Sequence, residues 1–268
     1  MKKLLSLVLC MIILSLSLTA CNRGDDGVTV IRIGATPTPH AEILEYISPF
    51  LLEEGIRLDI QVFTEFAFPN PALADGSLDA NYFQHVPFLD NFIAASGNEL
   101  HIVGAIHIEP MGAYSQTLND INELFYGATV AIPDCGVNGP RALMLLELHD
   151  VLTLNPYVGT RATIHDITDN PLNLQFIEIT ASLLPRVMLD READLSIINT
   201  NHVLAATDLD PVRDSLIMEP VESPYANVLV VRPEDADNPA ILTLLRHLQS
   251  ERVRAFILEN YSGVVPVF

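Results

Sequence analysis

A change from a strand pattern to a helix pattern within residues 79–91 constrains the fold more than any other stretch. Apolar and polar residues alternate from Leu78 to Tyr82, which predicts a strand, and the apolar spacing becomes helical at Val86. In an open α/β sheet, small ligands bind in the crevice beyond the carboxyl ends of the strands. We therefore expect three side chains at this strand end to project into such a crevice, namely Phe83, Gln84 and His85.

A strand, a helix and a second strand occupy the stretch before this one. Residues 28–33 alternate as a strand, apolar residues recur at helical spacing from Ile43 to Leu51, and residues 57–63 alternate again. A unit of this kind predicts a parallel pair of strands joined by a crossover helix.

The same alternation continues to the end of the chain, so the predicted fold class is α/β. Further strands are expected at 100–108, 111–115, 128–132, 176–179, 193–199 and 227–231. Further helices are expected at 70–75, 119–124, 139–149, 183–191, from 201 onward, at 239–249 and at 251–261.

A short internal repeat suggests two similarly built halves. Residues 75–81 and 190–196 both place an acidic turn, and then an apolar residue with Asp, at the start of a short strand that follows a helix. Two α/β lobes that face each other would form a cleft between them, which is a preferred position for a ligand.

The amino terminus has the pattern of an export signal. Two lysines precede an apolar run from Leu4 to Leu18, and small residues precede Cys21, so residues 1–20 read as a signal peptide. The sequence Leu-Thr-Ala-Cys is typical of a bacterial lipobox, in which Cys21 carries the lipid; the alternative is an ordinary signal with a chance cysteine. Residues 21–27 are polar and contain glycine, which predicts a flexible tether.

Charge and cysteine content exclude several classes of protein. The net charge is −20, and both lysines lie in the signal, so phosphate backbones are repelled and we expect no nucleic-acid partner. Cys135 is the only cysteine beyond residue 21, so no disulfide framework forms. No later apolar run is long enough to span a bilayer, and the membrane is expected to be reached through the lipid alone.

One loop in the second half has the composition of a carboxylate site. Residues 134–140 contain two glycines between a strand and a helix, and Arg141 follows. Free N–H groups at the start of the helix and the planar guanidinium would together suit a carboxylate. The alternative is that Arg141 pairs with a surface acid.

The candidate metal ligands do not form a complete set. His107 and Glu109 share a face of a predicted strand, and His40 with Glu42 offers a similar pair, but neither reaches the number of ligands that zinc needs. Hydrolase and nucleotide-binding motifs are absent from the sequence. We therefore predict no metal, no cofactor and no catalytic residue.

Four motifs lie in order along nearly the whole chain after residue 21, namely Gly34–Leu44, Leu78–His85, Ile198–Thr200 and Ser223–Asn227. Together they resemble the NlpA/MetQ family of methionine-binding lipoproteins. The resemblance implies a type II periplasmic-binding-protein fold with two lobes joined by two crossing segments. Lobe I would comprise residues 28–112 and 228–268, and lobe II residues 113–227.

The resemblance also implies the site residues. Phe83 and His85 would flank the side chain of the ligand, Arg141 would hold its carboxylate, and Asn199 and Asn227 would bind its amino-acid head group.

Two positions depart from the family pattern. Phe66 stands where many relatives have an aromatic residue with a hydroxyl, so an aromatic wall is expected there without a polar contact. Pro140 precedes Arg141 where relatives commonly have glycine, and it lacks an N–H group that the carboxylate would use.

The implied function is that of a lipid-anchored substrate-binding protein of an ABC importer, outside the cytoplasmic membrane. It would bind L-methionine or a related small amino acid and deliver it to a permease with its ATPase subunits. The alternatives are another amino acid, D-methionine or a methionine-containing dipeptide and, more remotely, a metal-dependent surface enzyme that uses the histidines.

Overall fold

The computed structural model describes residues 27–222 and 224–268. The predicted signal peptide, Cys21 and all but the last residue of the predicted tether lie outside the described residues. Within the described ranges, no helix combines the length and the apolar character needed to cross a membrane.

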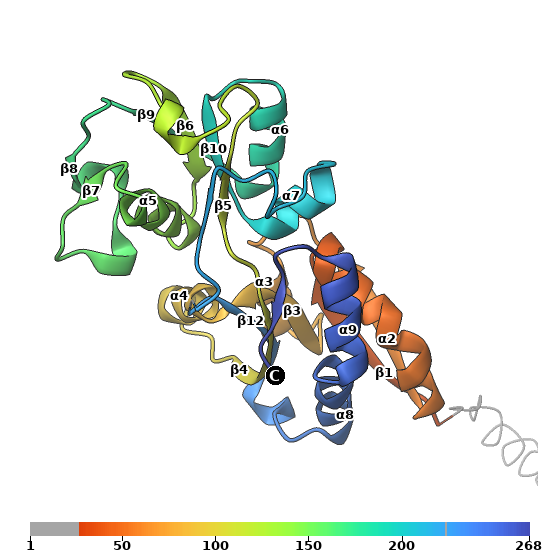
Figure 1. Ribbon diagram of the computed structural model, residues 1–268. Coiled ribbons are helices and arrows are strands. Elements are labelled where there is room, and N and C mark those ends of the chain that lie inside the picture. Colours follow the sequence, from red (N-terminus) through yellow and green to blue (C-terminus); the bar gives the residue numbers. More distant parts are fainter. Residues whose placement is uncertain (1–26, 223) are drawn as a thin grey trace, which may run out of the picture.

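Six strands form the first sheet (Figure 1). Its order is β13 (Val265–Pro266), β4 (His101–Ile108), β12 (Ala226–Val231), β3 (Ala80–His85), β1 (Thr29–Ala35) and β2 (Ile56–Val62). β1 pairs in parallel with both β2 and β3, which confirms the predicted parallel pair. β12 runs antiparallel to its two neighbours, β3 and β4.

Five strands form the second sheet, and two more form a separate ribbon. The sheet order is β11 (Ile217–Met218), β5 (Gly112–Tyr114), β10 (Leu195–Ile198), β6 (Thr129–Pro133) and β9 (Gln175–Ile179). The ribbon consists of β7 (Thr153–Leu154) and β8 (Ile167–Asp169). Strands β6, β9 and β10 are parallel, whereas β5 pairs antiparallel with β10 and β11.

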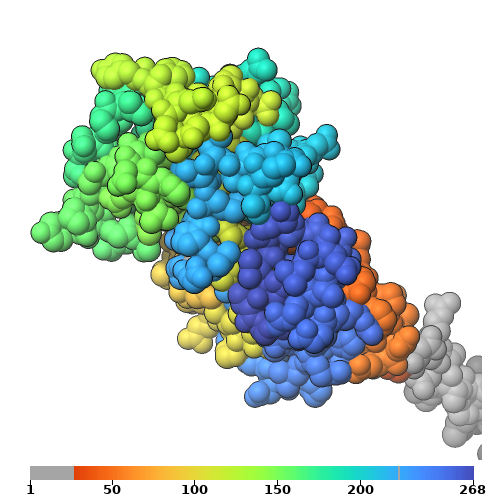
Figure 2. Space-filling model, viewed as in Figure 1, coloured from red at the N-terminus to blue at the C-terminus, as the bar shows by residue number. Residues whose placement is uncertain are grey.

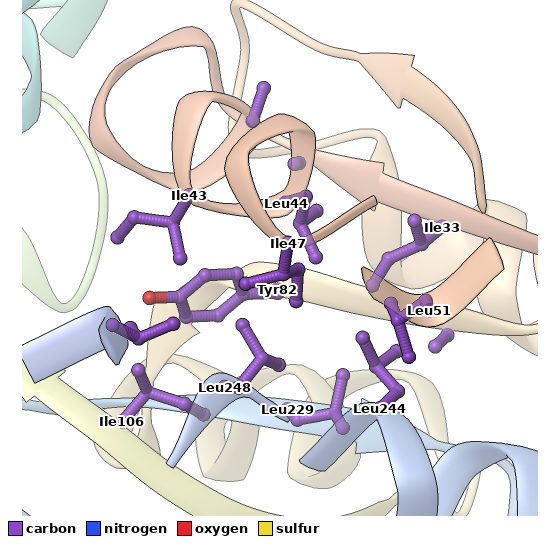
Figure 3. Close-up of a cluster of buried hydrophobic side chains, with 14 of the residues drawn as sticks. Ile33, Ile43, Leu44, Ile47, Leu51, Tyr82, Ile106, Leu229, Leu244 and Leu248 are labelled. Atoms are coloured by element: carbon purple, nitrogen blue, oxygen red, sulfur yellow. The ribbon is translucent and has the colours of Figure 1, made fainter. Parts of the chain in front are cut away.

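Helices cover both faces of the first sheet. α2 (Glu42–Glu53), α8 (Pro239–Leu248) and α9 (Glu251–Asn260) pack on one face, and the core that they form surrounds Tyr82 (Figure 3). α3 (Pro69–Ala74) and α4 (Val86–Ser96) pack on the opposite face. β12 serves both layers, because successive side chains of a strand point to opposite faces: Leu229 and Val231 enter the first core, and Val228 and Val230 the other.

The second sheet has the same three layers. α5 (Asn138–Leu148) packs on one face, and α6 (Leu184–Leu189) and α7 (Thr200–Ala206) pack on the other. Within the ranges that the structure describes there are also six short helices: η1 (Pro37–Ala41), η2 (Ile121–Glu123), η3 (Gly159–Arg161), η4 (Ile164–Asp166), η5 (Ala181–Leu183) and η6 (Pro233–Asp235).

The repeat seen in the sequence occupies equivalent positions in the two sheets. Asp79 accepts the N–H of Arg32 at 2.8 Å, and Asp194 accepts the N–H of Thr129 at 2.8 Å. In each case the backbone N–H of the aspartate also bonds to the backbone carbonyl of that partner, Arg32 or Thr129. A six-residue helix precedes each aspartate in the chain. Each aspartate thus ties the start of one parallel strand to its neighbour.

The chain passes between the sheets twice. It leaves the first sheet after Ile108 and enters the second at Gly112, and it leaves the second after Met218 and returns at Ala226. Early and late residues, orange and dark blue in Figure 2, therefore lie together in one lobe, while the green and cyan residues lie in the other.

One expected helix is wrong, and four short strands were not predicted. Residues 119–124 contain only the single turn η2, because the Asp120 carboxylate caps its start at the N–H of Asn122, at 2.8 Å, and the backbone of Leu124 is no longer helical. Strands β7, β8, β11 and β13 have two or three residues each, too few for an alternating pattern to be recognised.

Candidate functional site

A narrow cleft lies at the junction of the two lobes. Its lining comes from strand ends, helix starts and the first crossing: Phe66, Phe83, Gln84, His85, Phe88, Glu109, Asn138, Arg141, Asn199, Thr200, Asn201 and Asn227. All six residues predicted to bind ligand are among them. The centres of water molecules can occupy only about 20 Å³ of this space, so the side chains nearly fill the cleft.

The end of β3 supplies one wall and a bond to the other lobe. His85 Nδ1 accepts the N–H of Phe88 at 3.2 Å at the start of α4, so the ring proton is on Nε2, which donates to Asn138 Oδ1 at 3.0 Å. Burial, with the nearby positive charge of Arg141, lowers the pKa of His85 to about 3. A neutral His85 therefore links the first sheet to α5 of the second.

Arg141 lies almost fully buried in the first turns of α5. Its Nη2 donates to Glu219 Oε2 at 2.6 Å and to the Glu109 carbonyl at 2.8 Å, and its Nε donates to Glu219 at 2.8 Å. Its Cζ atom lies 3.9 Å from the centroid of the Tyr225 ring. The partner of Arg141 is thus a buried acid in the second crossing, and among the described residues Nη1 is left without a hydrogen bond inside the chain.

The expected contribution from backbone amides at the start of α5 is wrong. The N–H of Asn138 bonds to Cys135 Sγ at 3.2 Å, and the N–H of Gly139 bonds to the Cys135 carbonyl at 2.9 Å. Pro140 has no N–H, and that of Arg141 bonds to the Val137 carbonyl at 3.2 Å. These groups are satisfied within the loop and are not available to a carboxylate.

Aromatic rings form the apolar side of the cleft. The centroids of Phe66, Phe83 and Phe88 lie 6.0 to 6.3 Å apart, and the ring of His202 lies 4.9 Å from Phe66. Burial lowers the pKa of His202 to about 4, so this ring is neutral and packs as an aromatic. His202 escaped the sequence reasoning because nothing in its local pattern points towards Phe66.

Two asparagines bring amides to the cleft from different strands. Asn199 follows β10, and its Oδ1 is buried without a hydrogen-bond partner among the described residues. Asn227 lies in β12, and its Oδ1 is 3.1 Å from His40 Nε2. A buried acceptor that lacks a donor costs free energy unless a ligand supplies one.

Glu109, which begins the first crossing, brings a carboxylate to the cleft. Its Oε1 lies 2.6 Å from His107 Nε2 and 3.3 Å from His40 Nε2, and all three residues are buried. The predicted sharing of a face by His107 and Glu109 is confirmed. His40 and Glu42, the other pair considered as metal ligands, do not pair with each other, because Glu42 bonds to Thr38 and Tyr261.

Two α/β lobes, two crossings and a closed polar cleft with an aromatic wall define a two-lobed substrate-binding protein of the periplasmic-binding type. The family model of the NlpA lipoproteins matches residues 31–268. The chain therefore belongs to the NlpA lipoprotein family.

Relatives named for methionine binding match over nearly their whole length. The methionine-binding lipoprotein MetQ of Bacillus subtilis is 36% identical over 247 residues, which cover 91% of this chain and 90% of the relative. A probable D-methionine-binding lipoprotein MetQ of Vibrio cholerae is 35% identical over 251 residues, 93% of this chain and 92% of the relative.

Solved structures agree with the fold. A nutrient-binding protein from Burkholderia cenocepacia bound to methionine is 37% identical, with a TM-score of 0.85 over 89% of this chain and all of the other. The crystal structure of a methionine-binding lipoprotein from Bacillus subtilis is 36% identical, with a TM-score of 0.85 over 89% of this chain and 98% of the other. The predicted family and fold are confirmed.

Proposed function

We propose that this chain binds methionine, or a close derivative, between its lobes as the substrate-binding protein of an ABC importer. One observation carries the proposal: the cleft places a guanidinium, a carboxylate and a buried amide acceptor beside an aromatic wall. These are the groups that a zwitterion with an apolar side chain requires once it leaves water.

The head group is assigned to the polar half of the cleft. Nη1 of Arg141 makes no hydrogen bond within the described part of the chain and would receive the ligand's carboxylate. Oδ1 of Asn199, the buried acceptor without a donor, would receive an ammonium N–H. Asn227, the third predicted contact, lies in the same lining and would complete the binding of the head group.

The side chain of the ligand is assigned to the aromatic half. A thioether beside Phe66, Phe83 and the neutral ring of His85 would gain about 0.3 to 1.5 kcal/mol for each aromatic contact. Apolar walls of this kind also accept leucine or norleucine, so selectivity depends on how well the thioether packs.

Entry of an amino acid requires the lobes to separate, because the side chains nearly fill the cleft. The contacts across it, His85 with Asn138 at 3.0 Å and Glu65 with Ser182 at 2.6 Å, would form when the lobes close on the ligand. In this proposal lobe I comprises residues 28–112 and 228–268, lobe II comprises residues 113–227, and the permease recognises the closed form.

Anchoring through lipid on Cys21 is part of the same proposal. Curated relatives are named as lipoproteins, among them an outer membrane lipoprotein of Mannheimia haemolytica that is 37% identical. Acyl chains on one residue, each methylene contributing about 0.8 kcal/mol, would hold the protein on the outer side of the cytoplasmic membrane near its permease and ATPase subunits.

Native mass spectrometry tests the ligand directly. The chain without residues 1–21 is measured as purified, and again after unfolding and refolding, with L-methionine, D-methionine, leucine and glycyl-methionine offered separately. We expect selective rebinding of one methionine per chain. If no amino acid binds, or if leucine binds as tightly as methionine, the proposed ligand is wrong.

A further inference from the structure

The cluster of His40, His107 and Glu109 is unusual because three buried ligating groups meet at one point. The two Nε2 atoms and a carboxylate oxygen lie within 4.8 Å of one another. Two imidazoles and one carboxylate are also the ligands of many metal centres. Whether the cluster is a metal site or a hydrogen-bonded network depends on which ring nitrogen of each histidine carries its proton.

Each imidazole has an acceptor on one side and a hydroxyl on the other. His107 Nε2 faces Glu109 Oε1 at 2.6 Å, and its Nδ1 faces the Tyr82 hydroxyl at 2.5 Å. Because a carboxylate only accepts, the ring proton is on Nε2, and Nδ1 accepts from Tyr82.

His40 follows the same rule. Its Nε2 faces two acceptors, Asn227 Oδ1 at 3.1 Å and Glu109 Oε1 at 3.3 Å, and its Nδ1 faces the Thr36 hydroxyl at 2.7 Å. With a proton on Nε2 and with Nδ1 accepting the hydroxyl hydrogen of Thr36, both ring nitrogens of His40 are satisfied.

A metal ion would disturb this balance. It needs the lone pair of each Nε2, which moves both ring protons to Nδ1, opposite the hydroxyls of Thr36 and Tyr82. The hydroxyl hydrogens would then need other acceptors, and in residues 27–222 and 224–268 neither hydroxyl has a second hydrogen-bond partner. The network is complete with protons and incomplete with a metal.

His107 Nε2 therefore donates to Oε1 of Glu109, His40 Nε2 lies 3.3 Å from the same oxygen, and Oε2 makes no hydrogen bond to any residue that the structure describes. Glu109 lines the cleft, so Oε2 is the oxygen that these bonds leave for a ligand. Burial by itself raises the pKa of Glu109, but its interactions with His40, His107 and Arg141 outweigh burial and lower it. The carboxylate is ionised at neutral pH.

We infer that Glu109 Oε2 binds the ammonium group of the ligand, and that His40 and His107 are positioning residues that hold this carboxylate in place. The inference rests on the proposed function and adds an anionic contact to it. The His40 N–H also engages Asn227 Oδ1, which leaves the Asn227 Nδ2 group as a donor for the ligand's carboxylate. The ligand then has a fixed orientation in the cleft, with Glu109 and Asn199 at its ammonium end and Arg141 and Asn227 at its carboxylate end.

The test compares methionine with 4-(methylthio)butanoic acid, the same molecule without its amino group, by isothermal titration calorimetry on the chain without residues 1–21. Wild type should bind methionine at least about 30-fold more tightly, the lower end of the cost of removing one partner of a buried charge pair. Glu109→Gln should lose most of this preference, whereas Glu99→Gln, at an exposed position, should keep it.

The positioning role is tested at His107. The double variant His107→Phe with Tyr82→Phe removes the N–H but keeps an aromatic ring at position 107, and no buried hydroxyl is left without its acceptor. His107→Gln restores an N–H near the position of Nε2. We expect the preference for methionine over its deaminated analogue to fall in the double variant, and to be kept in both His107→Gln and Tyr82→Phe alone. Thermal melts would confirm that each variant is folded.

The outcomes separate the two proposals. If wild type binds methionine but binds the deaminated analogue equally well, the inference is wrong and the proposed function stands. If wild type binds no amino acid, both are wrong. Stoichiometric binding of zinc added alone, abolished by Glu109→Gln, would overturn the network in favour of a metal site.

Discussion

Replacing Arg141 by methionine should affect stability and affinity by two separable amounts. Methionine keeps an apolar stem but removes the guanidinium, whose Cζ lies 3.9 Å from the centroid of the Tyr225 ring and whose Nη2 lies 2.6 Å from Glu219. Both side chains are less than one-tenth exposed, so the change strands a carboxylate whose remaining donor among the described residues is the Met111 N–H at 2.8 Å. Breaking a buried pair in this way costs about 3 to 5 kcal/mol of the free energy of unfolding.

The corresponding loss in melting temperature is about 2 to 4 °C for each kcal/mol in a chain of this size. Independently, loss of the contact to the ligand's carboxylate should weaken methionine binding by about 2 to 5 kcal/mol, or roughly 30- to 4,000-fold. Thermal melts followed by circular dichroism measure the first quantity, and titration calorimetry measures the second.

A second substitution separates the two effects. Adding Glu219→Gln to Arg141→Met removes the stranded charge and should recover most of the lost stability, while affinity stays low. If affinity returns together with stability, Arg141 supports the fold without touching the ligand. If the single variant binds methionine as wild type does, the head-group assignment is wrong.

Three further predictions test the loop, the buried histidine and the anchor. A Cβ atom on Gly139 would lie 2.8 Å from the Pro133 carbonyl oxygen, so Gly139→Ala should shift α5 and lower both the melting temperature and the affinity. Gly136→Ala, where a Cβ atom would lie in open space, should change neither quantity. Equal effects of the two substitutions would refute this prediction. The pKa of His85 is about 3 in the folded chain, whereas in the unfolded chain it has the ordinary value of about 6.5. As the pH falls below about 6.5, the unfolded chain therefore binds a proton that the folded chain does not. Stability should therefore decline over that range, and His85→Gln should reduce the slope by about 1.4 kcal/mol per pH unit in urea titrations at pH 7, 6 and 5; an unchanged slope would contradict the assignment. Cys21→Ala should abolish membrane anchoring in cell fractionation without changing affinity, and a processed variant that stays on the membrane would refute the lipobox.

Local pattern predicted the elements well because it depends on neighbours in the chain. The helix expected at 139–149 occupies 138–148, and the strand expected at 227–231 occupies 226–231. Apolar spacing reports on which face of an element is buried, and burial on both faces explains the continuous apolar run of β12.

The chemistry of the cleft was only partly predictable. The resemblance named six lining residues, but it did not give Arg141 its partner Glu219, which lies 78 residues away along the chain. Sequence proximity suggested Glu42 as the partner of His40, whereas folding places His40 beside Glu109. Pairings of this kind depend on how strands are ordered in a sheet, and no local period contains that information.

The position of β12 has a consequence for the order in which the protein assembles. This strand is synthesised after every strand of the second sheet, yet it lies between β3 and β4 in the first. Lobe II is built from one continuous stretch and can complete its sheet while lobe I still lacks an interior strand. Pulse-labelling hydrogen exchange during refolding should therefore protect β6 and β10 before β3 and β4, and the last event in folding would be the one that joins the walls of the cleft.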